Sequence, residues 1–260
     1  MKTTRTSPTD GLAWVTGASS GIGRAVAFEL ARRGWRVAAT ARRADELVKM
    51  AIEAANQGLT IIPFAGDVTS REGLAKVVAD IEAQDRPIAL AFLNVGTFFP
   101  DDSGEWAGDA FRQTYEVNLF GTLNSLEPLL PRMIGRGRGQ VAIVSSVAGY
   151  VGLPRAAAYG SSKAALINMC ESLRFGLEPL GVGVQVICPG FVHTPLTAKN
   201  DFPMPFVIEA DDAARRICDG LASEQFEVAF PRRMVWLLKT LRLLPYSWFF
   251  KLVGRGTGRG

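Results

Sequence analysis

Histidine and cysteine are scarce in this chain, and their scarcity excludes several kinds of site. His193 is the only histidine among 260 residues, so we expect neither a histidine-based metal site nor a Ser-His-Asp triad, and no metal ligand set is predicted. The three cysteines, Cys170, Cys188 and Cys218, show no C-x-x-C spacing, and their odd number predicts no disulfide framework. A reducing, cytoplasmic setting is therefore expected.

Targeting segments, repeats and nucleic-acid signatures are missing as well. Residues 1–10 are polar and contain no apolar run of the kind that a secretory signal needs, and we expect them to be flexible. No repeat or change of composition divides the chain, which predicts a single domain over residues 1–260. The net charge is only +4, and no basic helix interleaved with base-stacking aromatics is evident, so no nucleic-acid partner is expected.

Short apolar runs are abundant, and they alternate with segments of helical spacing. Continuous apolar runs are typical of strands covered on both faces. Helices between such strands predict βαβ crossovers and a parallel, doubly wound α/β sheet of the Rossmann type, flanked by helices. Seven runs are expected to form the sheet, over residues 12–16, 35–40, 59–64, 88–94, 140–146, 183–188 and 226–230. A ligand in such a sheet lies beyond the carboxyl ends of the strands.

Three glycines follow the first predicted strand. Gly17, Gly21 and Gly23 separate that strand from an amphipathic stretch that predicts a helix. Glycine allows a close backbone approach, and the free N–H groups at a helix N-terminus suit a pyrophosphate. The loop therefore predicts a dinucleotide site, with an ordinary glycine turn as the alternative.

A tyrosine, a lysine and a serine form the candidate catalytic set. Tyr159 and Lys163 lie four residues apart, and Ser146 lies thirteen residues before Tyr159. Residues at i and i+4 share a helix face, and a nearby ammonium is expected to lower the pKa of the phenol from its ordinary value of ~10. Tyr159 is thus a candidate general acid–base group, and Ser146 a candidate donor to a substrate oxygen. Ser145 is the neighbouring alternative, although strand alternation directs only one of the two serines toward the site.

These motifs together resemble those of the short-chain dehydrogenase/reductase family, over about residues 12–230. The matching segments are Thr16-Gly17-x-x-x-Gly21-x-Gly23, Asp67-Val68, Asn118, the set of Ser146, Tyr159 and Lys163, and Pro189-Gly190 with Thr194. One motif departs from the family pattern. Leu93-Asn94-Val95-Gly96 stands where the family carries Asn-Asn-Ala-Gly, so two of four positions differ.

The resemblance implies an oxidoreductase that moves a hydride between a nicotinamide and a carbonyl or alcohol carbon. The catalytic residues that it implies are Asn118, for a relay water, Ser146, Tyr159 and Lys163, which would also hold the nicotinamide ribose. The cofactor contacts that it implies are Thr16, Gly17, Ser19, Ser20, Gly21, Ile22, Gly23, Asp67, Val68, Asn94, Gly96, Tyr159, Lys163, Pro189, Gly190, Val192 and Thr194. A nucleotide-binding sensor or scaffold without turnover is the alternative function, because fold alone does not establish activity.

Two arginines favour NADP(H) over NAD(H). An NAD site usually places a carboxylate about 20 residues after the glycines, where this chain carries Arg42 and Arg43. A guanidinium fork suits a 2′-phosphate, and Arg42 is our first candidate for that contact. NAD(H) stays possible, since Asp45 is close by and the two arginines could be a solvated pair.

Apolar residues cluster in the loops after the fourth and sixth predicted strands. They are Phe98, Phe99, Pro100, Phe191, Leu196, Phe202, Pro203, Met204 and Phe206. Loops at this edge commonly carry binding residues, so an apolar carbonyl or alcohol substrate is expected, with core packing or a subunit interface as the alternative. The resemblance also implies a homodimer or homotetramer, with helices in residues 103–136 and 157–179 as candidate contacts.

The C-terminal extension, residues 231–260, is aromatic, apolar and basic together. Pro245 and the charges of Lys239, Arg242 and Lys251 argue against a membrane-spanning helix. Two alternatives remain. Residues 232–253 could form an interfacial amphipathic anchor that makes the protein membrane-associated. They could also form a packing element that covers the sheet edge, roofs the substrate pocket or forms a subunit contact, which we favour. A bulky tail at this place argues against a tetramer formed through the end strand.

Overall fold

Seven parallel strands form one continuous sheet. The computed structural model describes residues 4–99, 108–199 and 203–256. The strand order is β3-β2-β1-β4-β5-β6-β7, which confirms the predicted doubly wound parallel sheet. The strands are β1 (Leu12–Thr16), β2 (Val37–Ala41), β3 (Ile61–Ala65), β4 (Ile88–Leu93), β5 (Gly139–Val144), β6 (Val182–Pro189) and β7 (Glu227–Phe230). Strands β2 and β3 begin two residues later than the apolar pattern predicts.

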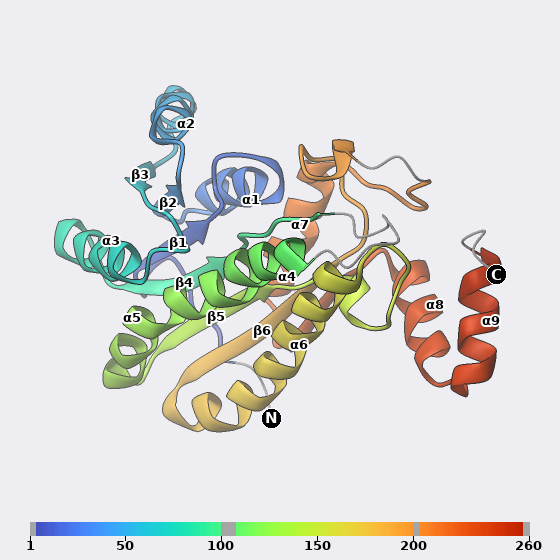
Figure 1. The fold of residues 1–260 in the computed structure, drawn as a ribbon. Helices are drawn as coiled ribbons and strands as arrows, with labels where there is room; N and C mark the ends of the chain where they lie inside the picture. The colour runs from blue at the N-terminus through green and yellow to red at the C-terminus, as the bar shows by residue number, and fades with distance from the viewer. Residues whose placement is uncertain (1–3, 100–107, 200–202, 257–260) are drawn as a thin grey trace.

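Helices cover both faces of the sheet (Figure 1). On one face lie α1 (Gly21–Arg32), α2 (Ala44–Asn56) and α7 (Ala210–Leu221), and on the other lie α3 (Arg71–Gln84), α4 (Gly108–Tyr115), α5 (Gly121–Arg136) and α6 (Ala157–Leu177). Because the sheet is buried on both sides, the central strands β1, β4 and β5 are buried along their whole length. Inside the sheet, the Trp14 indole N–H donates to Thr40 Oγ1 at 2.9 Å.

Successive strands extend the sheet on one side of β1 as far as β3, and on its other side from β4 onward. From β1 the chain moves outward to β2 and β3, then returns across the sheet to β4, which pairs with β1 on its other side. The loops after β1 and β4 therefore diverge at the carboxyl ends of these strands, and a crevice opens between them. The fold thus places the glycine loop and the segment after β4 on either side of one opening.

The N-terminal segment, expected to be flexible, lies against the opposite end of the sheet over residues 4–10. The Thr4 N–H donates to the buried Glu178 carboxylate at 3.1 Å, and the Thr6 N–H donates to Gln140 Oε1 at 2.9 Å. Asp10 accepts two hydrogen bonds from the Arg138 guanidinium, at 2.8 and 2.9 Å, and this partner lowers the pKa of Asp10 to about 2. We expected a flexible segment because it is polar, but its polar groups form hydrogen bonds with the domain.

The C-terminal extension forms two helices with different surroundings. The first, α8 (Arg232–Arg242), packs against the domain through its buried Met234 and Leu238. The second, α9 (Tyr246–Gly256), lies farther from the sheet (Figure 1), and Phe249 is the one buried side chain among those described on it. The packing alternative therefore describes α8 and not α9. Among the residues that the structure describes, no helix has both the length and the apolar character needed to cross a membrane.

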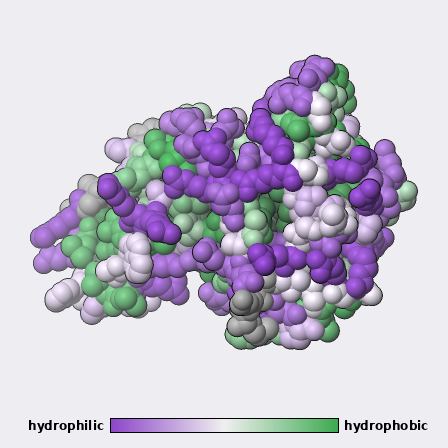
Figure 2. Space-filling view, turned by 180° about the vertical axis from the view of Figure 1, so that it is seen from behind, coloured by the Kyte–Doolittle hydropathy of each residue, from purple (hydrophilic) through white to green (hydrophobic). Residues whose placement is uncertain are grey.

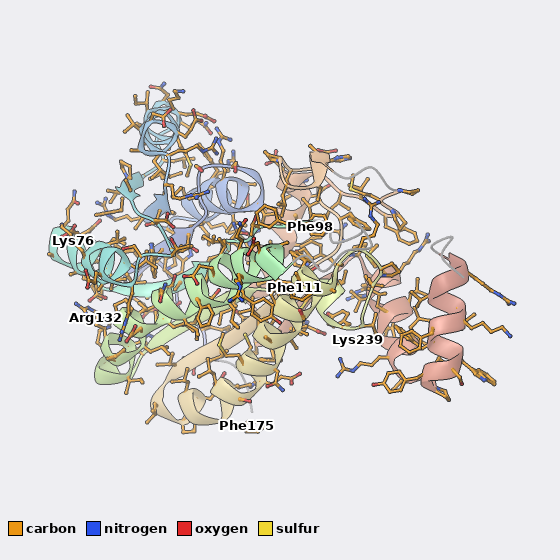
Figure 3. All side chains as sticks on the ribbon, viewed as in Figure 1. Lys76, Phe98, Phe111, Arg132, Phe175 and Lys239 are labelled. Carbon is orange, nitrogen blue, oxygen red and sulfur yellow. The ribbon has the colours of Figure 1, made fainter. Side chains whose placement is uncertain are left out.

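Polar contacts attach α8 to the sheet and to the loop that follows β5. The Lys239 ammonium donates to Glu227 on β7, and Figure 3 shows Lys239 on the side of α8 that faces the rest of the protein. The Tyr150 hydroxyl donates to the other Glu227 oxygen at 2.7 Å, and Arg242 donates to the Tyr150 carbonyl at 2.8 Å. Tyr150 follows Ser146 by four residues, so these contacts join α8 to the neighbourhood of the candidate catalytic serine.

Candidate active site

One large cavity opens at the carboxyl ends of the strands, with a volume of about 970 Å³. Nearly all of the expected site residues line it. They are Gly17, Ser19, Ser20, Gly21, Ile22, Arg42, Arg43, Asp67, Val68, Asn94, Gly96, Ser146, Tyr159, Lys163, Pro189, Gly190, Val192 and Thr194. Thr16 and Gly23, expected to contact the cofactor, and Asn118, expected to position a relay water, do not line the cavity. They support it from behind.

The glycine loop is packed too tightly for larger residues. A Cβ on Gly23 would lie 2.3 Å from the Gly17 carbonyl oxygen, and Gly17 itself has a φ of +65°. Behind the loop, Thr16 Oγ1 accepts the Asn94 N–H at 3.0 Å, which joins the ends of β1 and β4. The absence of a side chain at Gly23 lets helix α1 begin directly behind the loop. The first turn of α1 carries no acidic residue, so its free N–H groups and positive dipole end suit an anion.

The two arginines after β2 lie at the same end of the cavity. Arg43 Nη2 donates to Ser19 Oγ at 3.1 Å, so its guanidinium lies against the glycine loop. Arg42 also lines the cavity, and its side chain is exposed. A positive region therefore borders the N-terminus of α1. Asp67 follows β3, the strand that pairs with β2, and also lines the cavity, where one carboxylate oxygen is held by the Thr69 N–H and hydroxyl at 3.0 and 2.9 Å.

Tyr159 and Ser146 meet at the other end of the cavity. Ser146 faces the Tyr159 hydroxyl closely enough to oppose the rise in its pKa, and Ser146 Oγ donates to the Pro189 carbonyl at 3.3 Å. The Phe98 ring, labelled in Figure 3, stands edge-on to the Tyr159 ring at 5.5 Å between centroids. Ser145 Oγ instead donates to the Lys163 carbonyl at 2.7 Å. Strand alternation therefore separates the two serines as predicted, with Ser146 beside the phenol and Ser145 anchoring helix α6.

The pKa of Tyr159 differs from the expectation. Burial raises this pKa, and the hydrogen bond from Ser146 only partly opposes the rise. The Lys163 ammonium donates to the Val144 carbonyl at 2.9 Å and lies 5.7 Å from the centre of the Tyr159 ring, so its charge faces the phenol without offsetting the effect of burial. The expected net fall in the phenol pKa is therefore not found, and Tyr159 is protonated at neutral pH.

The pKa of Lys163 is also changed by its surroundings. It is 2% exposed, and burial lowers its pKa to about 8. The ammonium form thus predominates at neutral pH and is lost as the pH rises past this value. The Lys163 ammonium lies at the cavity and donates one hydrogen bond to the protein among the described residues. It can therefore donate further hydrogen bonds to a bound molecule.

Asn118 joins β4 to α6 from a π-helical turn, η1 (Glu116–Phe120), between α4 and α5. Its Oδ1 accepts the Thr97 N–H at 2.7 Å, and its Nδ2 donates to the Thr97 carbonyl at 3.1 Å and to Ser162 Oγ at 3.0 Å. Both amide hydrogens are therefore used, and the side chain has none left for a water. Asn118 thus positions the segment after β4 against Ser162 on α6.

The substrate end is less apolar than the loops suggest. Phe99 and Leu196 line the cavity, while Phe206 is 46% exposed. Pro100 and Phe202, also expected there, lie outside the described residues. Several polar lining residues were not expected from the sequence, among them Arg112, Gln113 and Glu116. Helical spacing on α4 and η1 places them on one side, but nothing in the sequence indicates that this side faces the cavity.

Comparison with known proteins establishes the family. A model of the short chain dehydrogenase family matches residues 12–203. The chain belongs to the short-chain dehydrogenase family. The match begins at β1 and extends past Thr194, so it includes the glycine loop, the Ser146, Tyr159 and Lys163 set, and the Pro189-Gly190 segment. The extension with α8 and α9 lies beyond it.

Several known proteins are similar to this chain over most of its length. An uncharacterized oxidoreductase from Myxococcus xanthus is 38% identical over 237 residues, which are 91% of this chain and 94% of that protein. The human 17-beta-hydroxysteroid dehydrogenase 13 is 27% identical over 234 residues, 89% of this chain and 78% of that protein. A short chain dehydrogenase/reductase from Burkholderia phymatum, solved in complex with NAD, matches with a TM-score of 0.82 at 21% identity and covers 90% of this chain and 94% of its own.

Proposed function

We propose that the protein is an NADP(H)-dependent oxidoreductase that reduces the carbonyl group of an apolar substrate, or oxidises the corresponding alcohol. The observation that carries the proposal is one cavity with an anion-binding loop at one end and the pair of Tyr159 and Ser146 at the other. A nicotinamide cofactor would supply or accept the hydride. The tight glycine loop, the N-terminus of α1 and the basic side chains fit a dinucleotide phosphate.

Three residues of this chain would bind the substrate oxygen, supply its proton and hold the cofactor. Ser146 would donate a hydrogen bond to the substrate oxygen, and Tyr159 would give that oxygen its proton. Because burial keeps Tyr159 protonated at neutral pH, the phenol is ready to act as the acid in carbonyl reduction. Lys163 would hold the cofactor ribose and keep a positive charge near the phenol while the proton leaves.

An apolar substrate is supported by the lining and by a relative. Phe99 and Leu196 lie in the cavity wall, and the human relative is named for a steroid substrate. Arg112, Gln113 and Glu116 add polar groups at the same end. We therefore propose a mainly apolar ketone or alcohol with a second polar group that contacts α4.

A homodimer is the assembly that we propose, in preference to a tetramer. Exposed apolar residues on or beside α5 and α6 support it: Phe120 is 48% exposed, Leu123 39% and Phe175 78%. Helix α8 packs against β7, so the end strand that pairs subunits in tetrameric relatives is partly covered here.

The class of reaction is tested by turnover with a substrate panel. We expect the purified chain to oxidise NADPH in the presence of at least one apolar ketone, quinone or aldehyde, with slower oxidation of NADH. The loss of cofactor absorbance measures the rate. Tight NADPH binding without turnover across the panel would instead support a nucleotide sensor or scaffold.

Arg42→Ala tests the choice of cofactor. We expect the variant to weaken NADPH binding by about tenfold and to leave NADH binding unchanged, because only the 2′-phosphate needs the guanidinium. Arg43→Ala is the matched comparison, since its guanidinium already contacts Ser19. Fluorescence titration with both cofactors gives the dissociation constants. Equal losses for NADPH and NADH in both variants would refute the assignment.

A further inference from the structure

The outward surface of the C-terminal extension has no partner within the described part of the chain. We call residues 232–256, with α8, α9 and the turn between them, the tail hairpin. Large apolar side chains cover its outer surface: Trp236 is 71% exposed, Leu237 56%, Leu243 84%, Tyr246 79%, Trp248 65%, Phe250 66% and Leu252 49%. In Figure 2 hydrophobic residues gather at the left of the molecule, where the hairpin lies, with hydrophilic residues around them. Exposed apolar patches of this kind mark interaction sites.

The aromatic side chains of α9 contact one another. The Tyr246 and Phe250 rings stack at 6.0 Å between centroids, and Phe249 meets Phe250 edge-on at 5.3 Å. Only Phe249 of these three is buried. The core therefore does not require Tyr246 and Phe250, and their exposure needs another reason.

The charge of the tail is one-sided. Residues 231–260 carry seven of the 29 basic residues and none of the 25 acidic ones, so the first 230 residues hold 22 basic and 25 acidic residues. Lys239 and Arg242 are used to attach α8. Arg232, Arg233, Lys251 and Arg255 are exposed, and within the described residues no carboxylate is recorded as their ion-pair partner. An apolar, aromatic surface is thus bordered by free positive charge.

We propose that the tail hairpin docks on the surface of a lipid bilayer that contains anionic lipids. Tryptophan and tyrosine favour the boundary between headgroups and acyl chains, and basic residues beside an apolar helical face add attraction to anionic headgroups. Each helix has 11 residues, about 16 Å at the usual rise of 1.5 Å per residue, which suits a helix that lies in the interface.

A second copy of the chain fits this surface less well. Two tail hairpins that packed together would bring several positive charges face to face, and the tail has no carboxylate to neutralise them. Water would be excluded from such a contact, which makes the repulsion stronger. Anionic headgroups solve both problems, since they supply the opposite charge and leave the aromatic rings in an apolar layer.

The attachment of α8 brings the proposed lipid surface close to the cavity. A Cβ on Gly190, a residue that lines the cavity, would lie 3.0 Å from Met234 Sδ on α8. A bilayer held by the hairpin would therefore lie beside the substrate end of the site. If the proposed function is correct, apolar substrates would reach the cavity from the membrane, although the docking itself does not depend on catalysis.

Vesicle binding by the full chain tests the proposal. We expect co-sedimentation with vesicles of phosphatidylcholine and phosphatidylserine, weaker binding to phosphatidylcholine alone, and weaker binding in high salt. Replacing Trp236, Trp248 and Phe250 together with serine should lower binding by at least about tenfold. Arg232→Gln with Lys251→Gln should lower binding to the anionic vesicles by about tenfold and remove most of the salt dependence.

A matched pair of exposed apolar residues far from the tail provides the control. Val48 and Ile52 on α2 are 49% and 59% exposed, and their double replacement with serine should leave vesicle binding unchanged. Circular dichroism and NADPH binding would show that every variant is folded. Equal binding to both vesicle types, or no binding to either, would overturn the proposal. Light scattering that shows self-association lost only in the tail variants, without vesicle binding, would assign the surface to a second copy instead.

Discussion

Tyr159→Phe is expected to lower turnover by about 10²- to 10⁴-fold, the range that a positioned general acid contributes, while NADPH binding changes little. The substitution removes the hydroxyl that Ser146 contacts and keeps the ring that packs edge-on against Phe98. Because the change removes only one oxygen, the shape of the cavity should be preserved. Steady-state rates and a fluorescence titration of NADPH would separate chemistry from binding.

Tyr150→Phe is the control for this result. Tyr150 lies in the loop after Ser146 and donates to Glu227 at 2.7 Å, so its hydroxyl attaches α8 and does not belong to the acid–base pair. We expect this variant to turn over within a few-fold of the parent and to unfold at a slightly lower temperature. If Tyr159→Phe retained turnover, or if both variants lost it equally, the role of Tyr159 as the acid would have to be abandoned.

Gly23→Ala is expected to disrupt both the cofactor site and the stability of the fold. The added Cβ would lie 2.3 Å from the Gly17 carbonyl oxygen and 2.6 Å from Asn94 Nδ2, so the glycine loop must move away from α1. Overpacking of this kind costs about 1–3 kcal/mol, which lowers the unfolding midpoint by roughly 2–4 °C per kcal/mol in a domain of this size. Displacement of the loop should also weaken NADPH binding by more than about tenfold.

The same substitution elsewhere shows whether the effect belongs to the loop. Gly135 lies in the last turn of α5, and a Cβ there would meet nothing within 4 Å. We expect Gly135→Ala to leave NADPH binding unchanged and to maintain or raise the midpoint, since alanine is favoured over glycine in a helix by about 0.5–1 kcal/mol. Thermal unfolding and NADPH titration of the two variants give the comparison, and normal binding by Gly23→Ala would contradict the proposed close packing.

Much of the fold follows from the apolar pattern, because parallel strands buried on both faces leave a strong signal. The start of β2 illustrates the limit of that signal. The predicted strand starts at Trp35, yet β2 begins at Val37. Trp35 is buried against the core beyond the end of the strand. Trp35 is buried because it packs against the core and not because it pairs with a neighbouring strand. Periodicity alone does not distinguish these two kinds of burial.

The site was predictable where its chemistry depends on residue type and spacing. The positions of Ser146, Tyr159 and Lys163 follow from a strand end and one helix face. The π-helical turn at Glu116–Phe120 was not predictable, since an extra residue within a helix leaves no compositional mark. That turn directs Asn118 toward Thr97 and Ser162. The pKa of Tyr159 also depends on burial and on where the lysine ammonium points, which spacing does not specify.

The tail shows a different limit. Its composition allowed both a packing element and an interfacial anchor, and the structure shows that α8 packs against the domain whereas α9 leaves most of its apolar side chains exposed. Met234 and Leu238 bury one side of α8, whereas Trp248 and Phe250 on α9 stay exposed. Helical spacing identifies an apolar side in each case. Which side meets the domain depends on contacts such as that between Arg242 and the Tyr150 carbonyl, which are 92 residues apart in the sequence.

The segment from Thr4 to Asp10 has a practical consequence for handling the protein. Its bonds to Glu178, Gln140 and Arg138 hold the amino end at the edge of the sheet opposite the cavity (Figure 1). A fusion partner or surface tether joined there would leave the cavity mouth and the tail hairpin open to solution. Immobilisation through the amino end therefore suits both cofactor titration and vesicle capture on a sensor chip, whereas a carboxyl-terminal tag would lie beside the aromatic surface being measured.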